Sequence, residues 1–194
     1  MGKQEDGVVT KVRDGVYDLR FERRIAVPVD KVWAALTIPE RLADWLAVAT
    51  VDLRMGGTIE LIWTEMGERN VGTIVELDPP RLLTFTWSEP DGAPGSVVRW
   101  ELTEEAGGCR LMMTNTLLRA AHLLDVGTGW HSLLDALPAA AMRAEPRPMT
   151  PEYVRQSRAR QAALIDRYRA KLPPDAAEVE WIEWKGLEPK QGGR

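Results

Sequence analysis

Three polar residues of this sequence stand where they could face a buried cavity: Arg23, Glu76 and Asn115. Arg23 interrupts the alternation of apolar and polar residues from Val16 to Val27, so on the inward register its charge needs a carboxylate, a ligand or water. For Arg23 we favour a bulge or a solvated strand end. For Glu76 we favour a side chain that points to solvent or pairs with Arg23. The amide of Asn115 can orient a ligand or simply satisfy the end of its strand.

No catalytic motif accompanies these residues. The sequence has no GxSxG elbow, P-loop, strand-linked GxGxxG or HExxH. His122 and His131 lie nine residues apart, which on a helix puts them on nearly opposite sides and argues against a shared metal. His131 is expected to be exposed or hydrogen-bonded, with Asp135 one turn beyond as a local partner. Because Cys109 is the only cysteine, no cysteine cluster can hold zinc, and we expect no metal and no cofactor.

Tryptophan is the strongest pointer to a binding site. The chain has 8 Trp but only 2 Phe and 3 Tyr, and indoles serve cores, ligand walls and partner surfaces alike. Several residues fall on faces that we assign inward and could together wall a pocket of roughly 300 to 1000 Å³. These residues are Trp63, Phe85, Trp87, Trp100, Met113, Trp130, Leu134 and Leu137. The alternative is that the indoles fill the core completely, and the sequence leaves both outcomes open.

The elements that must position these residues suggest a mixed α+β fold. About seven short alternating segments, separated by Gly and Pro turns, are typical of an antiparallel sheet. Two short helices are expected after Pro28, between the long second strand and the rest of the sheet. Residues 128–142 have apolar positions at spacings of three and four, which predicts a helix that packs on the sheet. Pro138 lies inside this helix and should kink or restart it.

A series of residues, ordered along the chain, resembles a known family. The series is Arg23, Ile25, Pro28, Val32, Trp33, Leu36, Pro39, Leu42, Trp45, Gly56, Gly57, Gly72, Glu76, Leu77, Pro79, Pro80, Phe85, Thr86, Trp87, Gly129, Trp130, Leu134, Asp135 and Leu137. It is similar to the activator of heat-shock protein 90 ATPase homologue (AHSA-like) family of the START/SRPBCC helix-grip superfamily. This resemblance implies a curved antiparallel sheet, two short helices, and a long last helix that closes a hydrophobic cavity.

The resemblance also frames three hypotheses of function. The leading one is noncatalytic binding of a small hydrophobic or aromatic molecule between the sheet and the helix from Thr128. The second is a chaperone-associated interaction protein, as the family name implies. The third is a polyketide cyclase-like or aromatase-like enzyme, because some members of the superfamily are such enzymes. By that analogy, Glu76 in an apolar pocket has a raised pKa and acts as acid or base, assisted by Asn115.

The chain is expected to divide into a helix-grip domain, residues 7–145, and a C-terminal extension, residues 146–194. Residues 151–172 predict a further helix, with one side formed by Val154, Gln161, Leu164, Ile165, Tyr168 and Leu172. Its excess of basic residues usually marks a solvated face, although a protein partner could bind there. The apolar segment 179–185, VEWIEWK, is expected to be an edge strand or a docking peptide.

Composition limits the partners and the compartment. A formal net charge of -4 argues against a nucleic-acid partner. We find no apolar run fit for a signal peptide or a membrane span, so the expected location is the cytoplasm, and no membrane partner is expected. A single cysteine suits a reducing compartment. The chain could also form a homodimer.

Overall fold

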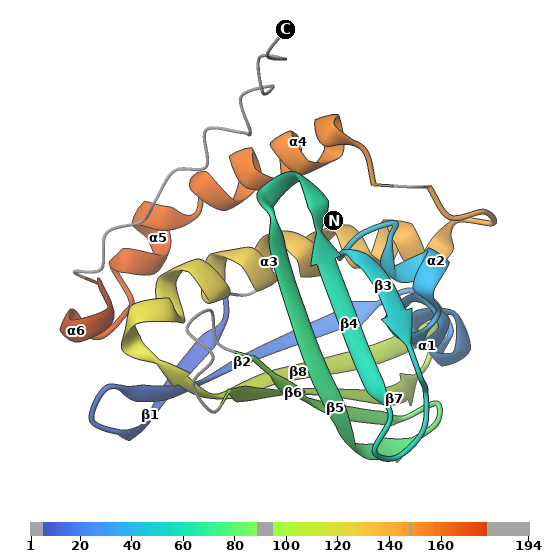
Figure 1. Cartoon of the computed structure of the whole chain (residues 1–194), viewed down its shortest axis with the longest axis horizontal. Coiled ribbons are helices and arrows are strands. Elements are labelled where there is room, and N and C mark those ends of the chain that lie inside the picture. Colours follow the sequence, from blue (N-terminus) through green and yellow to red (C-terminus); the bar gives the residue numbers. More distant parts are fainter. Residues whose placement is uncertain (1–5, 89–94, 148, 178–194) are drawn as a thin grey trace, which may run out of the picture.

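In the computed structural model, the described residues are 6–88, 95–147 and 149–177. Within them, eight antiparallel strands form one open sheet in the order β1-β2-β8-β7-β6-β5-β4-β3 (Figure 1). The strands are β1 (Val8–Arg13), β2 (Val16–Ile25), β3 (Val48–Val51), β4 (Thr58–Trp63), β5 (Glu68–Asp78), β6 (Leu82–Trp87), β7 (Ser96–Glu105) and β8 (Gly108–Arg119). The predicted antiparallel sheet is confirmed, with eight strands rather than about seven.

The helices lie on one side of this sheet. They are α1 (Val29–Thr37), α2 (Pro39–Leu42), the 3-10 turn η1 (Thr64–Met66), α3 (Ala120–Met142), α4 (Pro151–Ala162), α5 (Ile165–Arg169) and α6 (Pro174–Ala177). The long helix α3 crosses the inner face of the curved sheet, and α4 and α5 run along the side of α3 that faces away from the sheet (Figure 1). This arrangement confirms the expected mixed α+β, helix-grip architecture with two short helices after β2.

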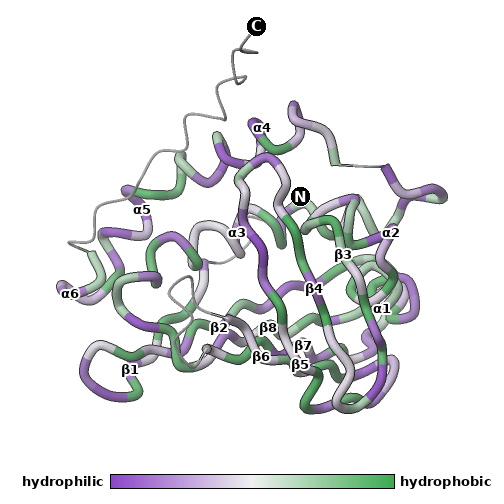
Figure 2. The backbone as a smooth tube through the Cα atoms, in the orientation of Figure 1, coloured by the Kyte–Doolittle hydropathy of each residue, from purple (hydrophilic) through white to green (hydrophobic). Residues whose placement is uncertain are grey.

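The core lies between the sheet and α3. Along β2, Leu19, Phe21 and Ile25 are buried while Arg20 and Arg24 are exposed, as a strand with one buried face requires. Figure 2 shows the same alternation of hydrophobic and hydrophilic residues along other strands of the sheet. Burial of these apolar side chains is the main favourable contribution to folding, so the inner face fixes the register of the strands.

Helix α3 is longer than the sequence suggested. It begins at Ala120, directly after β8, instead of at Thr128, and it runs as one helix through Pro138 to Met142, so no restart occurs at the proline. Gly127 lies inside the helix, at a position where a side chain would crowd α5. A Cβ atom at this position would lie 3.3 Å from the ring of Tyr168. The glycine therefore marks a close approach of α3 and α5 rather than a helix start.

The C-terminal extension packs on α3. The single helix expected over residues 151–172 is instead divided into α4 and α5, with Leu164 donating a backbone hydrogen bond to the carbonyl of Gln161 at 2.9 Å between them. The predicted inner side is confirmed, because Val154, Gln161, Ile165, Tyr168 and Leu172 are buried and Leu164 is half-buried. The segment 179–185 lies outside the described residues. The division of the chain into two domains near residue 145 stays a prediction.

Candidate functional site

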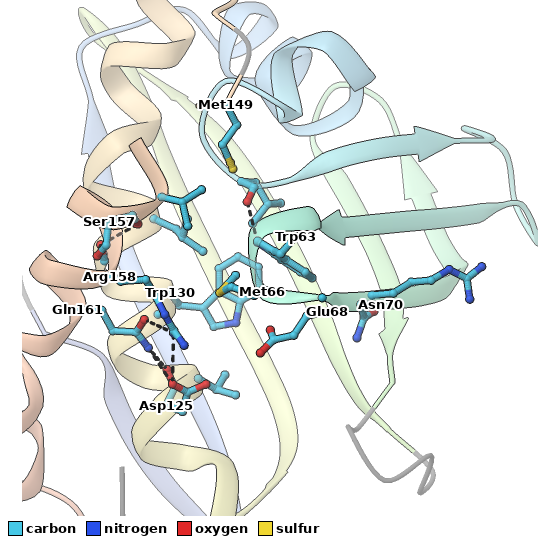
Figure 3. Close-up of a pocket in the computed structure, with 18 of the residues that line it drawn as sticks. Trp63, Met66, Glu68, Asn70, Asp125, Trp130, Met149, Ser157, Arg158 and Gln161 are labelled. Carbon is cyan, nitrogen blue, oxygen red and sulfur yellow. Dashed lines mark hydrogen bonds and ion pairs between the residues drawn. The ribbon is translucent and has the colours of Figure 1, made fainter. Parts of the chain in front are cut away.

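A cleft of about 570 Å³ opens between α3, α4 and the hairpin formed by β4 and β5 (Figure 3). The hairpin rises past α3, and its tip at η1 lies next to α4 (Figure 1). Gly67 makes the tip possible, since its φ of 68° lies in the left-handed region that glycine adopts at no steric cost. The lining residues are Leu46, Trp63, Met66, Gly67, Glu68, Arg69, Asn70, Trp87, Ser88, His122, Asp125, Val126, Gly129, Trp130, Ser132, Leu133, Met149, Tyr153, Val154, Ser157, Arg158 and Gln161.

Three indoles form the aromatic wall of this cleft, which we define as Trp63, Trp87 and Trp130. Trp63 ends β4, Trp87 ends β6 and Trp130 lies on α3, with ring centroids 6.0 Å apart for Trp63 and Trp87 and 5.3 Å apart for Trp87 and Trp130. The indole N–H of Trp63 donates to the Leu46 carbonyl at 2.8 Å, and that of Trp130 donates to Asn115 Oδ1 at 3.1 Å. These bonds hold two of the three rings in place, so the wall is largely preformed.

The remaining apolar residues expected to line a pocket lie in the core behind the wall. They are all buried and none lines the cleft: Phe85, Trp100, Met113, Leu134 and Leu137. Trp100 stands edge-on to Trp130, with centroids 5.4 Å apart. The indoles thus divide between the two outcomes that the sequence left open, because Trp100 fills the core while the aromatic wall faces the cleft.

Asn115 supports the aromatic wall but does not reach the cleft. It is fully buried, and besides accepting from Trp130 it donates through Nδ2 to the Val97 carbonyl at 3.4 Å. Both ends of its amide are therefore engaged by the protein. Asn115 positions an indole, and of the two roles that the sequence left open for its amide, contact with a ligand has no support in this geometry.

Glu76 faces away from the cleft and is exposed, as we favoured, so the place in an apolar pocket that the cyclase analogy implied is wrong. A β-bulge causes the change: Ile74 pairs with Phe85 and Glu76 with the adjacent Thr84, so two residues of β5 oppose one of β6. Ile74 points inward, whereas Glu76 lies on the outer face and is hydrogen-bonded by Thr84 at 2.7 Å and by Arg99. The hydrogen bond from Thr84 and the charge of Arg99 lower the pKa of Glu76, the opposite of the shift that the cyclase analogy implied.

Arg23 is buried and points inward, so the bulge or solvated strand end that we favoured is wrong. The pairing of β2 with β8 is regular from Leu19 to Ile25. The Arg23 guanidinium lies 3.4 Å from Asp135 of α3 and 5.3 Å from the centre of the Phe21 ring. Burial lowers the pKa of Arg23, opposed by the charge of Asp135. Arg23 lies outside the cleft lining and serves the packing of α3 on β2.

A buried polar network, of which the sequence predicted only the contact between His131 and Asp135, joins the chain's first described residues to the extension. His131 is buried, and its Nδ1 lies 2.9 Å from the Tyr168 hydroxyl, which also accepts from the Gly7 amide at 3.0 Å. His131 Nε2 lies 3.5 Å from Asp135, as the sequence suggested. Burial raises the pKa of Tyr168 to about 12.

Asp6 completes this network through two cations of the extension. Arg167 Nε donates to it at 2.9 Å, and Lys171 forms a second ion pair. Burial alone would raise the pKa of Asp6, but the hydrogen bonds from Lys171 and Arg167 outweigh burial and lower it. The network therefore docks α5 against α3 and the start of β1.

Opposite the aromatic wall, polar side chains gather at the mouth of the cleft (Figure 3). Arg158 of α4 donates to Gln161 Oε1 at 2.6 Å and lies 3.7 Å from Asp125 of α3. Gln161 donates in turn to Asp125 Oδ1 at 2.9 Å and to Thr128 at 3.2 Å. The sequence did not predict this polar group. Its one indication there was Gln161, a polar residue on the predicted inner side of the extension.

Glu68, the first residue of β5, points into the cleft from the opposite side (Figure 3). Desolvation raises the pKa of its carboxyl group, the nearby charge of Asp125 adds to this effect, and the charge of Arg158 opposes it. Nothing in the alternation of residues 68–78 marks Glu68 as a cleft residue, because its position depends on how the hairpin approaches α4.

The open antiparallel sheet gripping one long helix, with a cleft beside that helix, defines a helix-grip protein. The chain belongs to the family described as activator of Hsp90 ATPase homolog 1-like protein, whose model matches residues 26–141. This match confirms the resemblance seen in the sequence. The matched region holds the aromatic wall and Glu68, while Met149, Tyr153, Ser157 and Arg158 lie beyond its end.

Several solved structures are similar to this chain. CalU16 from Micromonospora echinospora is 30% identical, with a TM-score of 0.60 over 83% of this chain and 98% of that chain. MLL2253 from Mesorhizobium loti is 24% identical, with a TM-score of 0.61 over 66% of this chain and 98% of that chain. The Aha1 dimer from Colwellia psychrerythraea is 17% identical, with a TM-score of 0.58 over 64% of this chain and 95% of that chain. No curated protein matches the chain.

Two features of the described residues bear on partners. No helix among them is long and apolar enough to cross a membrane. The same residues include no group of three or more His, Cys, Asp or Glu side chains placed to hold a metal ion.

Proposed function

We propose that this protein binds a small hydrophobic or aromatic molecule in the cleft, without catalysing a reaction on it. The observation that carries the proposal is the aromatic wall: three indoles from three elements face a space of about 570 Å³. Ligand sites usually measure roughly 300 to 1000 Å³ and combine apolar walls with a few polar groups. A ring stacked on such a wall gains about 0.5 to 1.5 kcal/mol per aromatic contact beyond its buried area.

The extension supplies the opposite wall of the cleft. Tyr153 lines the cleft, and its hydroxyl donates to the Trp45 carbonyl at 3.2 Å. Val154 and Ser157 follow on the same side of α4. A ligand in the cleft would therefore lie between the family domain and the extension and contact both.

Filling the cleft tests this proposal. The variant Ser157→Trp places an indole into the cleft from α4, whereas Gln156→Trp, its neighbour, adds the same side chain on the exposed side of the helix. Nile red, a neutral apolar dye, should brighten with the wild type and with Gln156→Trp, and Ser157→Trp should weaken its binding at least tenfold. Equal binding by the two variants, or no binding by the wild type, would refute the proposal.

A second candidate is interaction with a chaperone, which the family description favours. Arg155 and Arg160 are exposed on α4 and offer a basic surface to a protein partner. Charge reversal at both positions should weaken co-sedimentation with Hsp90, while reversal at Arg54, a distant exposed arginine, should not. An unchanged interaction, or none with the wild type, would exclude this surface as the partner site.

A homodimer stays a proposal, supported by the solved dimer of Aha1 from Colwellia psychrerythraea. Sedimentation velocity over a range of protein concentrations would test it, and a single monomeric species at all of them would count against it. A location in the cytoplasm also stays a proposal, which a buried single thiol, Cys109, suits. A cyclase-like reaction through Glu76 and Asn115 has no support in the geometry, because neither residue lines the cleft.

A further inference from the structure

The cations around the cleft are paired with other groups and not with the Glu68 carboxylate. Arg158 is engaged by Gln161 and lies 3.7 Å from Asp125, and Arg69 donates to Glu60 at 2.5 Å. Among the described residues, no side chain or backbone group gives the Glu68 carboxylate a hydrogen bond, and no cation lies within 4.0 Å of it. Glu68 is an exposed residue in the lining of an aromatic cleft, and the protein thus leaves its carboxylate without a counter-ion.

The orientation of the Glu68 side chain suits a ligand in the cleft. It points across the cleft toward the side where Asp125 and Arg158 lie, and the rings of Trp63 and Trp130 stand beside it (Figure 3). The faces of indole rings carry negative potential and attract cations, most strongly among aromatic side chains. A positive group next to this wall would therefore meet the ring faces and the carboxylate together.

We propose that the ligand is an aromatic molecule that carries a protonated amine, with its ring on the aromatic wall and its ammonium group on Glu68. This inference rests on the proposed function, since it needs a ligand in the cleft. An ammonium ion would supply the counter-ion that Glu68 lacks. An anion would be repelled by Glu68 and Asp125 and would have to compete with them for Arg158.

Arg158 defines the competing possibility. Its buried Nε has no hydrogen-bond partner, so a ligand carboxylate that reached it could bind there. However, its Nη1 already contacts Gln161 and Asp125, and the neutral pairing of Arg158 with Asp125 leaves little net attraction for an anion. The charge balance thus favours a cation, and a test must measure both signs.

Three probes with the same ring and different charge separate these possibilities. They are 1-naphthylmethylamine, 1-naphthylmethanol and 1-naphthoate, titrated by calorimetry near pH 7 into the full chain. The wild type should bind the amine about tenfold more tightly than the alcohol, because a charged hydrogen bond and a cation–π contact are both gained. Glu68→Gln should remove most of this preference. Glu65→Gln, a change of the same charge on the same hairpin but outside the cleft lining, should keep it within about twofold.

The outcomes distinguish this inference from the proposed function. If the amine and the alcohol bind equally well, or if Glu68→Gln keeps the preference, the inference is wrong while ligand binding stands. If naphthoate binds most tightly and Arg158→Gln abolishes that binding, the site takes an anion and the inference is overturned. If none of the three probes binds and Nile red does not bind either, the proposed function fails, and the inference fails with it.

Discussion

The hydroxyl group of Tyr168 is expected to contribute strongly to stability, and Tyr168→Phe tests this. The change removes one oxygen atom and leaves the ring in place. In the wild type this oxygen accepts from the Gly7 amide at 3.0 Å and lies 2.9 Å from His131 Nδ1. Because His131 and Tyr168 are both buried, water cannot easily replace the lost partner. A buried group left without its hydrogen bond costs about 1 to 3 kcal/mol.

The expected loss in the free energy of unfolding is therefore about 2 to 3 kcal/mol, since the Gly7 amide and His131 Nδ1 both lose a partner and His131 is buried. Tyr17→Phe is the matched control. Tyr17 is as buried as Tyr168, but its hydroxyl donates to Asp175, which is exposed and can return to water. Its loss should be about 1 kcal/mol or less. Urea unfolding followed by tryptophan fluorescence measures both, and the melting temperature should fall by about 2 to 4 °C per kcal/mol.

The pKa of Tyr168 gives a second measurement, which reports the burial of the same hydroxyl group. Its raised value of about 12 means that the folded state disfavours the phenolate relative to the unfolded chain, where the pKa is near 10. The stability that it contributes is thus fully present below pH 10 and is lost as the pH rises toward 12. Tyr168→Phe should lack this part of the alkaline loss. A loss in urea no larger than that of Tyr17→Phe would refute the reasoning about the buried network.

Three further predictions concern the cleft and its surroundings. Asn115→Ala leaves the buried Trp130 indole N–H without an acceptor and should lower the free energy of unfolding by about 2 to 4 kcal/mol in urea melts. Glu76→Gln should leave Nile red binding unchanged. Because folding lowers the pKa of Glu76, the stability that its carboxylate contributes is present above about pH 4.5 and is lost in acid. The variant should therefore be less stable than the wild type only at the higher pH. Glu68→Gln should have the opposite effect on stability, because the raised pKa of Glu68 means that folding disfavours its ionised form. The variant should be more stable than the wild type above pH 4.5, by at most about 1 kcal/mol, and equally stable in strong acid.

The layout of the sheet could be predicted because burial acts on every second residue. Leu19, Phe21 and Ile25 repeat this period, and a slip of one residue would expose all of them. The same rule could not locate Glu76. One extra residue in β5 reverses the faces after Ile74, and both registers of residues 72–77 carry apolar side chains. A bulge depends on pairing with the neighbouring strand, which the sequence of one strand does not contain.

The aromatic wall could be predicted only in part, for a different reason. Trp63, Trp87 and Trp100 all occupy inward positions, but their depth depends on where they fall along their strands. Trp63 and Trp87 are the last residues of β4 and β6 and so reach the edge of the core, whereas Trp100 lies in the middle of β7 and is covered. The opposite wall could not be foreseen, because it requires α4 to pack on α3, and helix periodicity alone does not say where the buried side of a helix docks.

One wall of the cleft lies within the region that the family model matches, and the other lies beyond its end. Trp63, Trp87 and Trp130 lie within residues 26–141, the region that the family model matches, and their support by Leu46 and Asn115 lies there too. Tyr153, Ser157 and Arg158 lie after that region. A domain with the matched residues alone would present its indoles on an open face, where a ring could stack but would stay half in water. The extension changes this face into a cleft, so the shape and charge of the ligand should depend on α4 as much as on the indoles that anchor it.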